Sequence, residues 1–170
     1  TLPVVDLPEI GGVVVGDVSS PWVDLGDERA TLVSGDVNGD GLDDLVVGTR
    51  FYTLMDAPTA PSVRVFLGGT RPEAGATLSF DDSDMEIFAV LGGDGMGGAG
   101  QLSLGDIDGD GRADLAAGAT DESTDYSGAG YIFTADTLAL GTINASEADV
   151  ILDTSVPDAK ASRDLSLTMD

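Results

Sequence analysis

GDIDGDGRAD, residues 105–114, is the stretch that decides the fold of this chain. Hard cations such as Ca²⁺ bind roughly six to eight oxygen ligands, and alternate residues of a tightly turned loop can direct their side chains to one centre. The acidic residues of this stretch stand at positions 1, 3, 5 and 9 of a short loop: Asp106, Asp108, Asp110 and Asp114. The spacing predicts a calcium-binding loop.

An earlier stretch repeats this pattern at an offset of 70 residues: GDVNGDGLDD, residues 35–44. The same four positions hold Asp36, Asn38, Asp40 and Asp44. Gly41 and Gly111 occupy position 6, where such a loop turns sharply and glycine is favoured. At position 7, Leu42 and Arg112 are expected to contribute only their backbone carbonyl oxygens. The repetition favours two calcium sites, one in each loop.

The alternative interpretation is a pair of ordinary surface turns, because Asp, Asn and Gly are common turn residues. Electrostatics favours an ion. Two carboxylates about 4 Å apart repel by roughly 4 kcal/mol at an effective dielectric of about 20, and solvent screening removes only part of this repulsion. A loop that gathers four carboxylates is therefore expected to open unless a cation joins them.

The EF-hand is the closest competing loop, since it also begins D-x-[DN]-x-[DN]-G. An EF-hand requires a bidentate Glu at position 12, and Val47 and Ala117 stand there instead. Short apolar runs follow each loop, LVVG at 45–48 and LAAG at 115–118, and these are typical of buried strands. Each loop is therefore predicted to join two strands.

The composition predicts a folded, strongly acidic domain. The chain has 170 residues, 42% of them hydrophobic, and its 31 acidic and 7 basic residues give a formal net charge of −24. Nucleic acids and anionic membrane surfaces require basic patches, so neither is expected as a partner. No apolar run approaches the length of a membrane span, and direct membrane insertion is not expected.

Short apolar segments separated by Gly, Pro and Asp turns predict an all-β fold with almost no helix. The predicted strands cover residues 13–15, 31–34, 45–47, 63–67, 77–80, 87–90, 102–104, 115–117, 131–134, 150–152 and 165–168. A repeat of 60 to 70 residues that holds four strands is typical of one blade of a β-propeller. We expect a partial preceding blade or connecting segment at 1–29, blades at 30–98 and 99–157, and the start of a further repeat at 158–170.

The two loops and the strands that follow them resemble the FG-GAP repeats of integrin α-subunit β-propellers and of bacterial secreted relatives. The resemblance is carried by GDVNGDGLDDLVVG with SVRVFLGG, and by GDIDGDGRADLAAGATDESTDYSGAGYIF. It implies four-stranded blades, a Ca²⁺ ion between the first two strands of each blade, and a role in extracellular recognition or adhesion. It also implies an extracellular or cell-surface location, with the periplasm as an alternative.

The resemblance implies a protein or glycan ligand and leaves two further readings open. Incomplete blades from several chains could pair into a ring or filament, because unpaired strand edges favour association. Alternatively, further blades of the same longer chain could complete the propeller. An accessory part of a secreted enzyme is the last reading. The chain has no His and no Cys, so neither a Ser-His-Asp triad nor a thiol nucleophile can form, and no catalytic activity is expected.

Three smaller motifs are interpreted as structural. Residues 93–98 satisfy G-x-G-x-x-G, but no βαβ pattern surrounds them, so a turn is favoured over a dinucleotide site. Asp81, Asp82, Asp84 and Glu86 are interpreted as a solvated turn, with an auxiliary metal site as the alternative. Asp121, Glu122 and Asp125 are interpreted in the same way, with contact to a partner through a bridging cation as the alternative.

Overall fold

The structure is a computed structural model, and it describes eight segments of the chain. They are residues 12–14, 30–49, 63–70, 76–78, 82–88, 101–120, 128–139 and 141–153. Strands dominate these segments, and the only helices are short: η1 (Gly68–Thr70), α1 (Ala135–Leu138) and η3 (Ala145–Glu147). The predicted all-β, blade-like fold is confirmed. No helix in these segments is long and apolar enough to cross a membrane.

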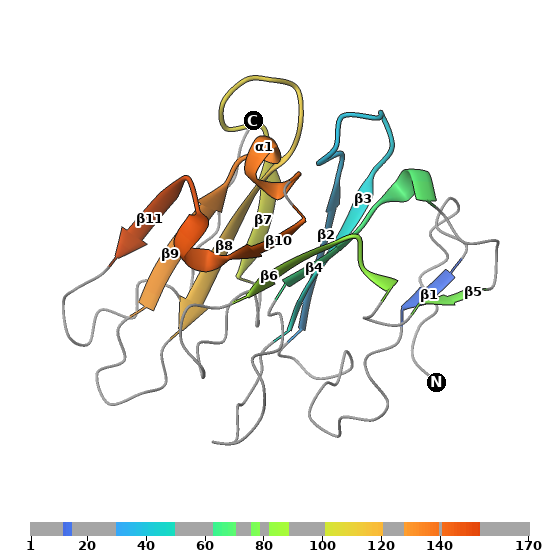
Figure 1. Ribbon diagram of the computed structural model, residues 1–170, viewed down its shortest axis with the longest axis horizontal. Coiled ribbons are helices and arrows are strands. Elements are labelled where there is room, and N and C mark those ends of the chain that lie inside the picture. Colours follow the sequence, from blue (N-terminus) through green and yellow to red (C-terminus); the bar gives the residue numbers. More distant parts are fainter. Residues whose placement is uncertain are drawn as a thin grey trace, which may run out of the picture.

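Two sheets, each built around one acidic loop, contain most of the strands (Figure 1). The first sheet has the order β10-β6-β4-β3-β2, formed by Thr142–Asn144, Met85–Phe88, Val63–Phe66, Asp44–Thr49 and Ala30–Gly35. The second has the order β11-β9-β8-β7, formed by Val150–Asp153, Gly128–Phe133, Asp114–Thr120 and Leu102–Gly105. Apart from β10, each sheet consists of four antiparallel strands from one unit, and one other strand, β5 (Ala76–Leu78) or β10, lies in sequence between the third and the fourth.

Each predicted strand within the described segments overlaps an observed one. The predicted strand at 165–168 lies outside them. Residues 77–80 were expected as a blade strand, and the observed β5 (Ala76–Leu78) pairs instead with β1 (Gly12–Val14), in parallel. β10 was not predicted, because a single apolar residue between Thr142 and Asn144 gives no alternating pattern. The unit boundaries at residues 98 and 157 stay predictions.

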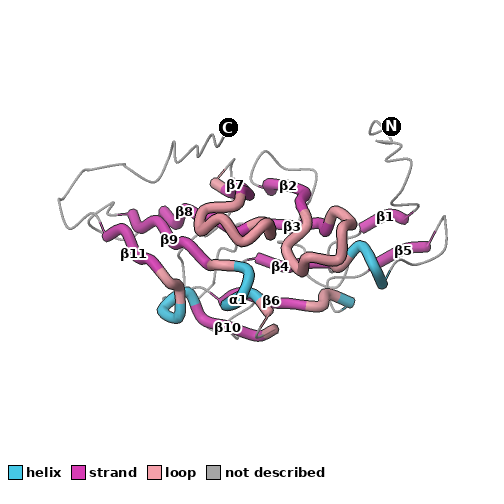
Figure 2. The backbone as a smooth tube through the Cα atoms, turned by 90° about the horizontal axis from the view of Figure 1, so that it is seen from above, coloured by secondary structure: helices cyan, strands magenta, loops and turns pink. Residues whose placement is uncertain are grey.

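β10 crosses from the second unit to the first sheet. In sequence it lies between β9 and β11. It pairs in parallel with β6, the last strand that the first unit contributes to the first sheet. Figure 2 shows the two sheets side by side, with β7 next to β2 and β10 beside β6. The two sheets are therefore linked at two places: where β2 lies next to β7, and where β10 pairs with β6.

A single hydrophobic core extends through both sheets. Val46, Val65 and Ile87 contribute from the first sheet, and Leu115 and Phe133 from the second, all of them buried. Burying aliphatic and aromatic side chains of this size stabilises a fold by about 1.5–3 kcal/mol for each residue relative to leaving it exposed. Because both sheets share this core, it fixes the positions of the strand ends, and therefore of the two acidic loops, relative to each other.

Candidate metal centre

The two acidic loops join the first two strands of each sheet, as the sequence predicted. Residues 36–43 connect β2 to β3, and residues 106–113 connect β7 to β8. The loops lie at the same edge of the structure (Figures 1 and 2). Gly41 and Gly111 adopt φ angles of 83° and 88°, in the left-handed region that glycine enters without steric cost. The sharp turn predicted at position 6 is confirmed.

The carboxylate at position 1 of each loop is enclosed by backbone N–H groups. In the second loop, Gly109 and Asp110 donate to Oδ1 of Asp106 at 2.6 and 3.0 Å, and Gly111 donates to Oδ2 at 2.9 Å. The first loop repeats these three bonds to Asp36 at 2.7, 3.1 and 2.8 Å. Oδ1 accepts two of these bonds and Oδ2 only one, so Oδ2 keeps a lone pair that can bind a cation.

The carboxylate at position 9 ties the loop to the chain that follows the third strand. Oδ2 of Asp114 accepts the N–H of Ile107 at 2.7 Å, and Oδ1 accepts the N–H of Ala135 at 2.9 Å. Asp44 accepts the corresponding groups of Val37 and Gly68, both at 2.8 Å. Both Asp44 and Asp114 are fully buried, and in each sheet two separate pieces of backbone, the loop and the chain after the third strand, donate to one side chain.

Burial has a further effect on Asp44. Removal from water disfavours the charged carboxylate and raises its pKa above the usual value, although the N–H groups of Gly68 and Val37 act in the opposite direction. A cation in the loop would also favour the charged form, because opposite charges stabilise each other. The environment of this side chain is therefore compatible with a positively charged ligand.

Positions 3 and 5 distinguish the two loops. Oδ1 of Asn38 accepts the N–H of Asp40 at 2.8 Å, and Oδ1 of Asp108 accepts the N–H of Asp110 at 3.0 Å, so the backbone turn is the same. Nδ2 of Asn38 also donates to Oδ2 of Asp40 at 3.1 Å, a bond that a carboxylate at position 3 cannot make.

Three of the four carboxylates in the second loop converge. Asp106, Asp108 and Asp114 each present an oxygen atom within 4.8 Å of the other two. Two oxygens that bind the same Ca²⁺ at 2.3–2.6 Å lie at most about 5.2 Å apart. The oxygen-only donor set and its spacing therefore fit Ca²⁺ without a change of backbone.

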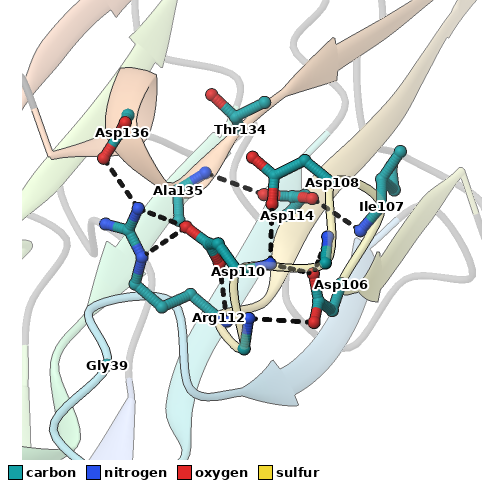
Figure 3. A network of polar contacts seen from close by, with 12 residues as sticks. Gly39, Asp106, Ile107, Asp108, Asp110, Arg112, Asp114, Thr134, Ala135 and Asp136 are labelled. Atoms are coloured by element: carbon teal, nitrogen blue, oxygen red, sulfur yellow. Dashed lines mark hydrogen bonds and ion pairs between the residues drawn. The ribbon is translucent and has the colours of Figure 1, made fainter.

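Arg112 holds the fourth carboxylate away from this group (Figure 3). Its guanidinium forms an ion pair with Oδ2 of Asp110 and reaches Oδ1 of Asp136, in α1, at 2.7 Å. The pairing lowers the pKa of Asp110, through the Arg112 side chain first and its N–H second, and it raises the pKa of Arg112. The Arg112 side chain also passes close to Gly39 of the first loop, where an added Cβ would lie 3.0 Å from Cδ and 3.1 Å from Cγ of Arg112.

The predicted ligands thus fall into two groups. In the second loop, the structure brings Asp106, Asp108 and Asp114 together and turns Asp110 toward Arg112. In the first loop, Asp36, Asn38, Asp40 and Asp44 are organised by the same backbone bonds. Leu42 and Arg112 donate their N–H groups to the position 5 carboxylates at 2.8 Å, and the role predicted for their carbonyl oxygens stays a prediction.

Sequence reasoning missed the contacts around these loops. The N–H groups of Gly68 and Ala135 and the carboxylate of Asp136 complete the site, and no spacing rule points to them. The loops also touch, because the N–H of Ala113 donates to the carbonyl oxygen of Asp36 at 2.7 Å. A comparison of the two units by the second residue after each third strand would have identified Gly68 and Ala135 as equivalent.

The smaller motifs have separate outcomes. Asp84 accepts the N–H of Leu67 at 2.8 Å and so fastens a turn, in line with the structural interpretation of its cluster. Asp81, residues 93–98 and the group Asp121, Glu122 and Asp125 lie outside the described segments.

Two sheets, each with four antiparallel strands from one unit and an acidic loop between the first two, define an all-β repeat protein of the β-propeller type. Two segments of the chain, residues 29–67 and 98–133, match the FG-GAP repeat. The chain therefore contains two FG-GAP repeats, and the resemblance predicted from its loops is confirmed.

Relatives of known identity point the same way. The chain is 36% identical over 104 residues to integrin alpha-4 of Xenopus laevis and 34% identical over 108 residues to integrin alpha-PS2 of Drosophila melanogaster. Each match covers 61% of this chain, but only 9% and 7% of those proteins, so the chain spans less than a tenth of their length. No solved structure matches the chain.

Proposed function

We propose that this chain is a calcium-binding part of an extracellular β-propeller that recognises a protein or glycan, in the manner of an adhesion module. The observation that carries the proposal is the convergence of the Asp106, Asp108 and Asp114 carboxylates within 4.8 Å. The similarity to two integrin alpha chains supports the recognition role.

Calcium would have a structural task in this proposal. In the second loop, Asp106, Asp108 and Asp114 would hold the ion, with Asp110 and the Arg112 carbonyl completing the set. In the first loop, Asp36, Asn38, Asp40, Asp44 and the Leu42 carbonyl would do so. The ion supplies positive charge that offsets the repulsion among the carboxylates. The chain supplies the geometry, because the N–H groups around Asp106 and Asp114 orient those side chains.

Calorimetric titration of the calcium-stripped chain with Ca²⁺ tests the proposal directly. We expect two binding events, and an increase in the free energy of unfolding of about 2.7 kcal/mol when free Ca²⁺ exceeds the Kd of a site a hundredfold. EDTA is expected to reverse that increase.

Variants assign the sites. Asp108→Asn places at position 3 the residue that the first loop already carries, so the turn is kept while one charge is removed; we expect weaker binding at the second site only. Asp106→Ala should abolish binding at that site.

The matched control is Asp43→Asn, which removes an exposed carboxylate of the first loop that is not a predicted ligand and should leave binding at both sites unchanged. The absence of both a binding heat and a shift in melting temperature would refute the calcium proposal.

A further inference from the structure

The outer edge of the second sheet carries an apolar strand, β11, whose counterpart in the first sheet, β6, is covered by the further strand β10. Val150, Ile151 and Leu152 of β11 are all exposed, by 43%, 47% and 49%. Among the described strands, β11 pairs only with β9. An apolar strand with a free edge is a ready site for another strand, because its outward N–H and C=O groups lack partners in the sheet.

The repeat identifies the equivalent residues in the first sheet. β4 and β9 are the third strands of the two units, with Phe66 and Phe133 opposite Leu45 and Leu115. Counting back from these two phenylalanines, Val63 corresponds to Gly130. Val63 pairs with Ile87 of β6, and Gly130 pairs with Leu152 of β11. Ile87 and Leu152 therefore occupy the same place in their sheets, as do Met85 and Val150.

These equivalent residues differ sharply in burial. Ile87 is 0% exposed and Met85 is 8% exposed, against 49% for Leu152 and 43% for Val150. The first sheet has an additional strand at this place, since β10 pairs in parallel with β6 and sets Ile143 opposite Ile87. Ile143 is itself 2% exposed. The second sheet has no such strand among the described residues.

The structure contains the same arrangement a second time. β5 lies between the third and fourth strands of the first unit, as β10 does in the second. It pairs in parallel with the earlier strand β1, and Leu78 lies opposite Val14. Both added strands contain a threonine followed by a large apolar residue, Thr77-Leu78 and Thr142-Ile143. In both cases the added strand comes from the unit that follows in the sequence. We call such a strand a return strand.

We propose that the free edge of β11 is the docking site for the return strand of a further repeat that follows this segment in the same chain. The strand would run parallel to β11, as β10 does to β6, and its apolar residue would lie opposite Leu152. The inference rests on strand pairing and burial and does not depend on the calcium sites. A second copy of the chain is the competing occupant.

An extended chain tests the proposal. The full chain, residues 1–170, is followed by a copy of residues 107–157, so that Asp170 takes the place of Asp106 and the copy supplies one more return strand. We expect the amides of residues 150–153 to exchange with solvent at least about tenfold more slowly in the extended chain than in the original. The control is the same extended chain with the copied Ile143 changed to Asp, which should restore fast exchange.

Cysteine pairing tests the register in the same protein. The natural sequence has no cysteine, so two engineered ones react only with each other. We expect oxidation to join Leu152→Cys with a cysteine at the copied Ile143. Ile151→Cys should react much less, because neighbouring residues of a strand point to opposite faces. Should the added unit not fold, a peptide of residues 138–148 with Ile143→Cys replaces it, and the same preference for Leu152→Cys is expected.

Four results would overturn the proposal. One is slow exchange of residues 150–153 already in the original chain at low concentration. Another is a dimer by light scattering whose formation protects β11, since a second copy would then be the occupant. The others are a folded extended chain with unprotected β11, and equal cysteine reaction at positions 151 and 152.

Discussion

Arg112 is the residue that most clearly separates the two acidic loops. At the predicted side-chain ligand positions 1, 3, 5 and 9, the first loop has three carboxylates and one amide, and the second has four carboxylates. Position 7 is Leu42 in the first loop and Arg112 in the second. The guanidinium pairs with Asp110 and Asp136, so it offsets the additional carboxylate of the second loop. At positions 1, 3, 5, 7 and 9 the two loops therefore carry the same formal charge, and Asp43 adds a further exposed carboxylate to the first loop.

Replacement of Arg112 tests this balance. Arg112→Leu, which copies the first loop, is expected to tighten Ca²⁺ binding at the second site, because more uncompensated negative charge faces the ion. In EDTA the variant should lose little stability, since exposed ion pairs contribute little. Calorimetric titration measures the first effect and urea unfolding the second. Asp136→Asn, which removes one partner outside the loop, is the control and should change the affinity less; unchanged affinity in Arg112→Leu would contradict the charge argument.

Gly68 is required by a close backbone approach. A Cβ atom at this residue would lie 2.4 Å from the carbonyl oxygen of Asp43, and the Gly68 N–H must still reach Asp44. Gly68→Ala is expected to destabilise the chain by about 1–3 kcal/mol in urea unfolding. Gly69→Ala is the matched control. Its Cβ would meet only the end of the flexible Asp40 side chain, at 2.7 Å, so a smaller loss is expected in EDTA. Equal losses would show that the approach to Asp43 is not the cause.

At the scale of the elements, an aspartate ahead of each outer strand fastens the end of the third strand. Oδ2 of Asp149, just before β11, accepts the N–H of Thr134 at 2.7 Å and its hydroxyl at 3.0 Å. Asp84, just before β6, accepts the N–H of Leu67 in the same way. In both units, the end of the third strand is therefore fastened in the same way to the residue just before the outer strand.

The pKa of Asp149 makes this fastening dependent on pH. Burial alone would raise this pKa, but the hydrogen bonds from Thr134 and Thr137 outweigh it and lower the pKa below the usual value of 3.8. A lowered pKa means that the folded state holds the charged form more strongly than the unfolded state does. The stabilisation is therefore complete above the usual pKa and is lost as the pH falls through the lower, folded value.

Asp149→Ala is expected to cost about 1 kcal/mol of stability at pH 7, the typical net value of a hydrogen bond. The difference from the natural chain should narrow when unfolding is measured below pH 3.8. Asp43→Ala removes an exposed carboxylate and serves as the control. A difference that stays constant between pH 7 and pH 2 would show that the charged form of Asp149 is not what stabilises the turn.

At the scale of the whole molecule, β10 joins the two units into one core. Ile143 is buried with residues from both sheets, and the two loops are linked directly through Ala113 and Asp36. A domain with one continuous core usually unfolds in a single cooperative transition. We therefore expect the first and second sheets to unfold together, at one temperature.

Ile143→Ala tests the shared core. It should lower the free energy of unfolding by about 2–5 kcal/mol, as is typical of a buried Ile→Ala change, and should shift one transition without splitting it. Scanning calorimetry, with the calorimetric and van't Hoff enthalpies compared, gives the result. Thr142→Ala changes an exposed neighbour on the same strand and should have little effect. A second transition in Ile143→Ala would show instead that the units unfold separately.

The sequence by itself determined the two acidic loops, their strand-joining character and the all-β repeat. These features depend on local rules: glycine at a turn that requires positive φ, aspartates at alternate positions, and short apolar runs between turns. Such rules act within about ten residues, so they can be recognised without knowledge of the rest of the chain.

Only the tertiary structure decided which distant groups meet. The pairing of Arg112 with Asp136, the approach of Gly68 to Asp43, the contact between the two loops and the crossing of β10 to β6 all join residues far apart in sequence. The sequence near β10 contains one apolar residue and no alternation, so its strand exists because the edge of β6 was free to receive it. Packing against a partner strand, and not local propensity, determines such a strand.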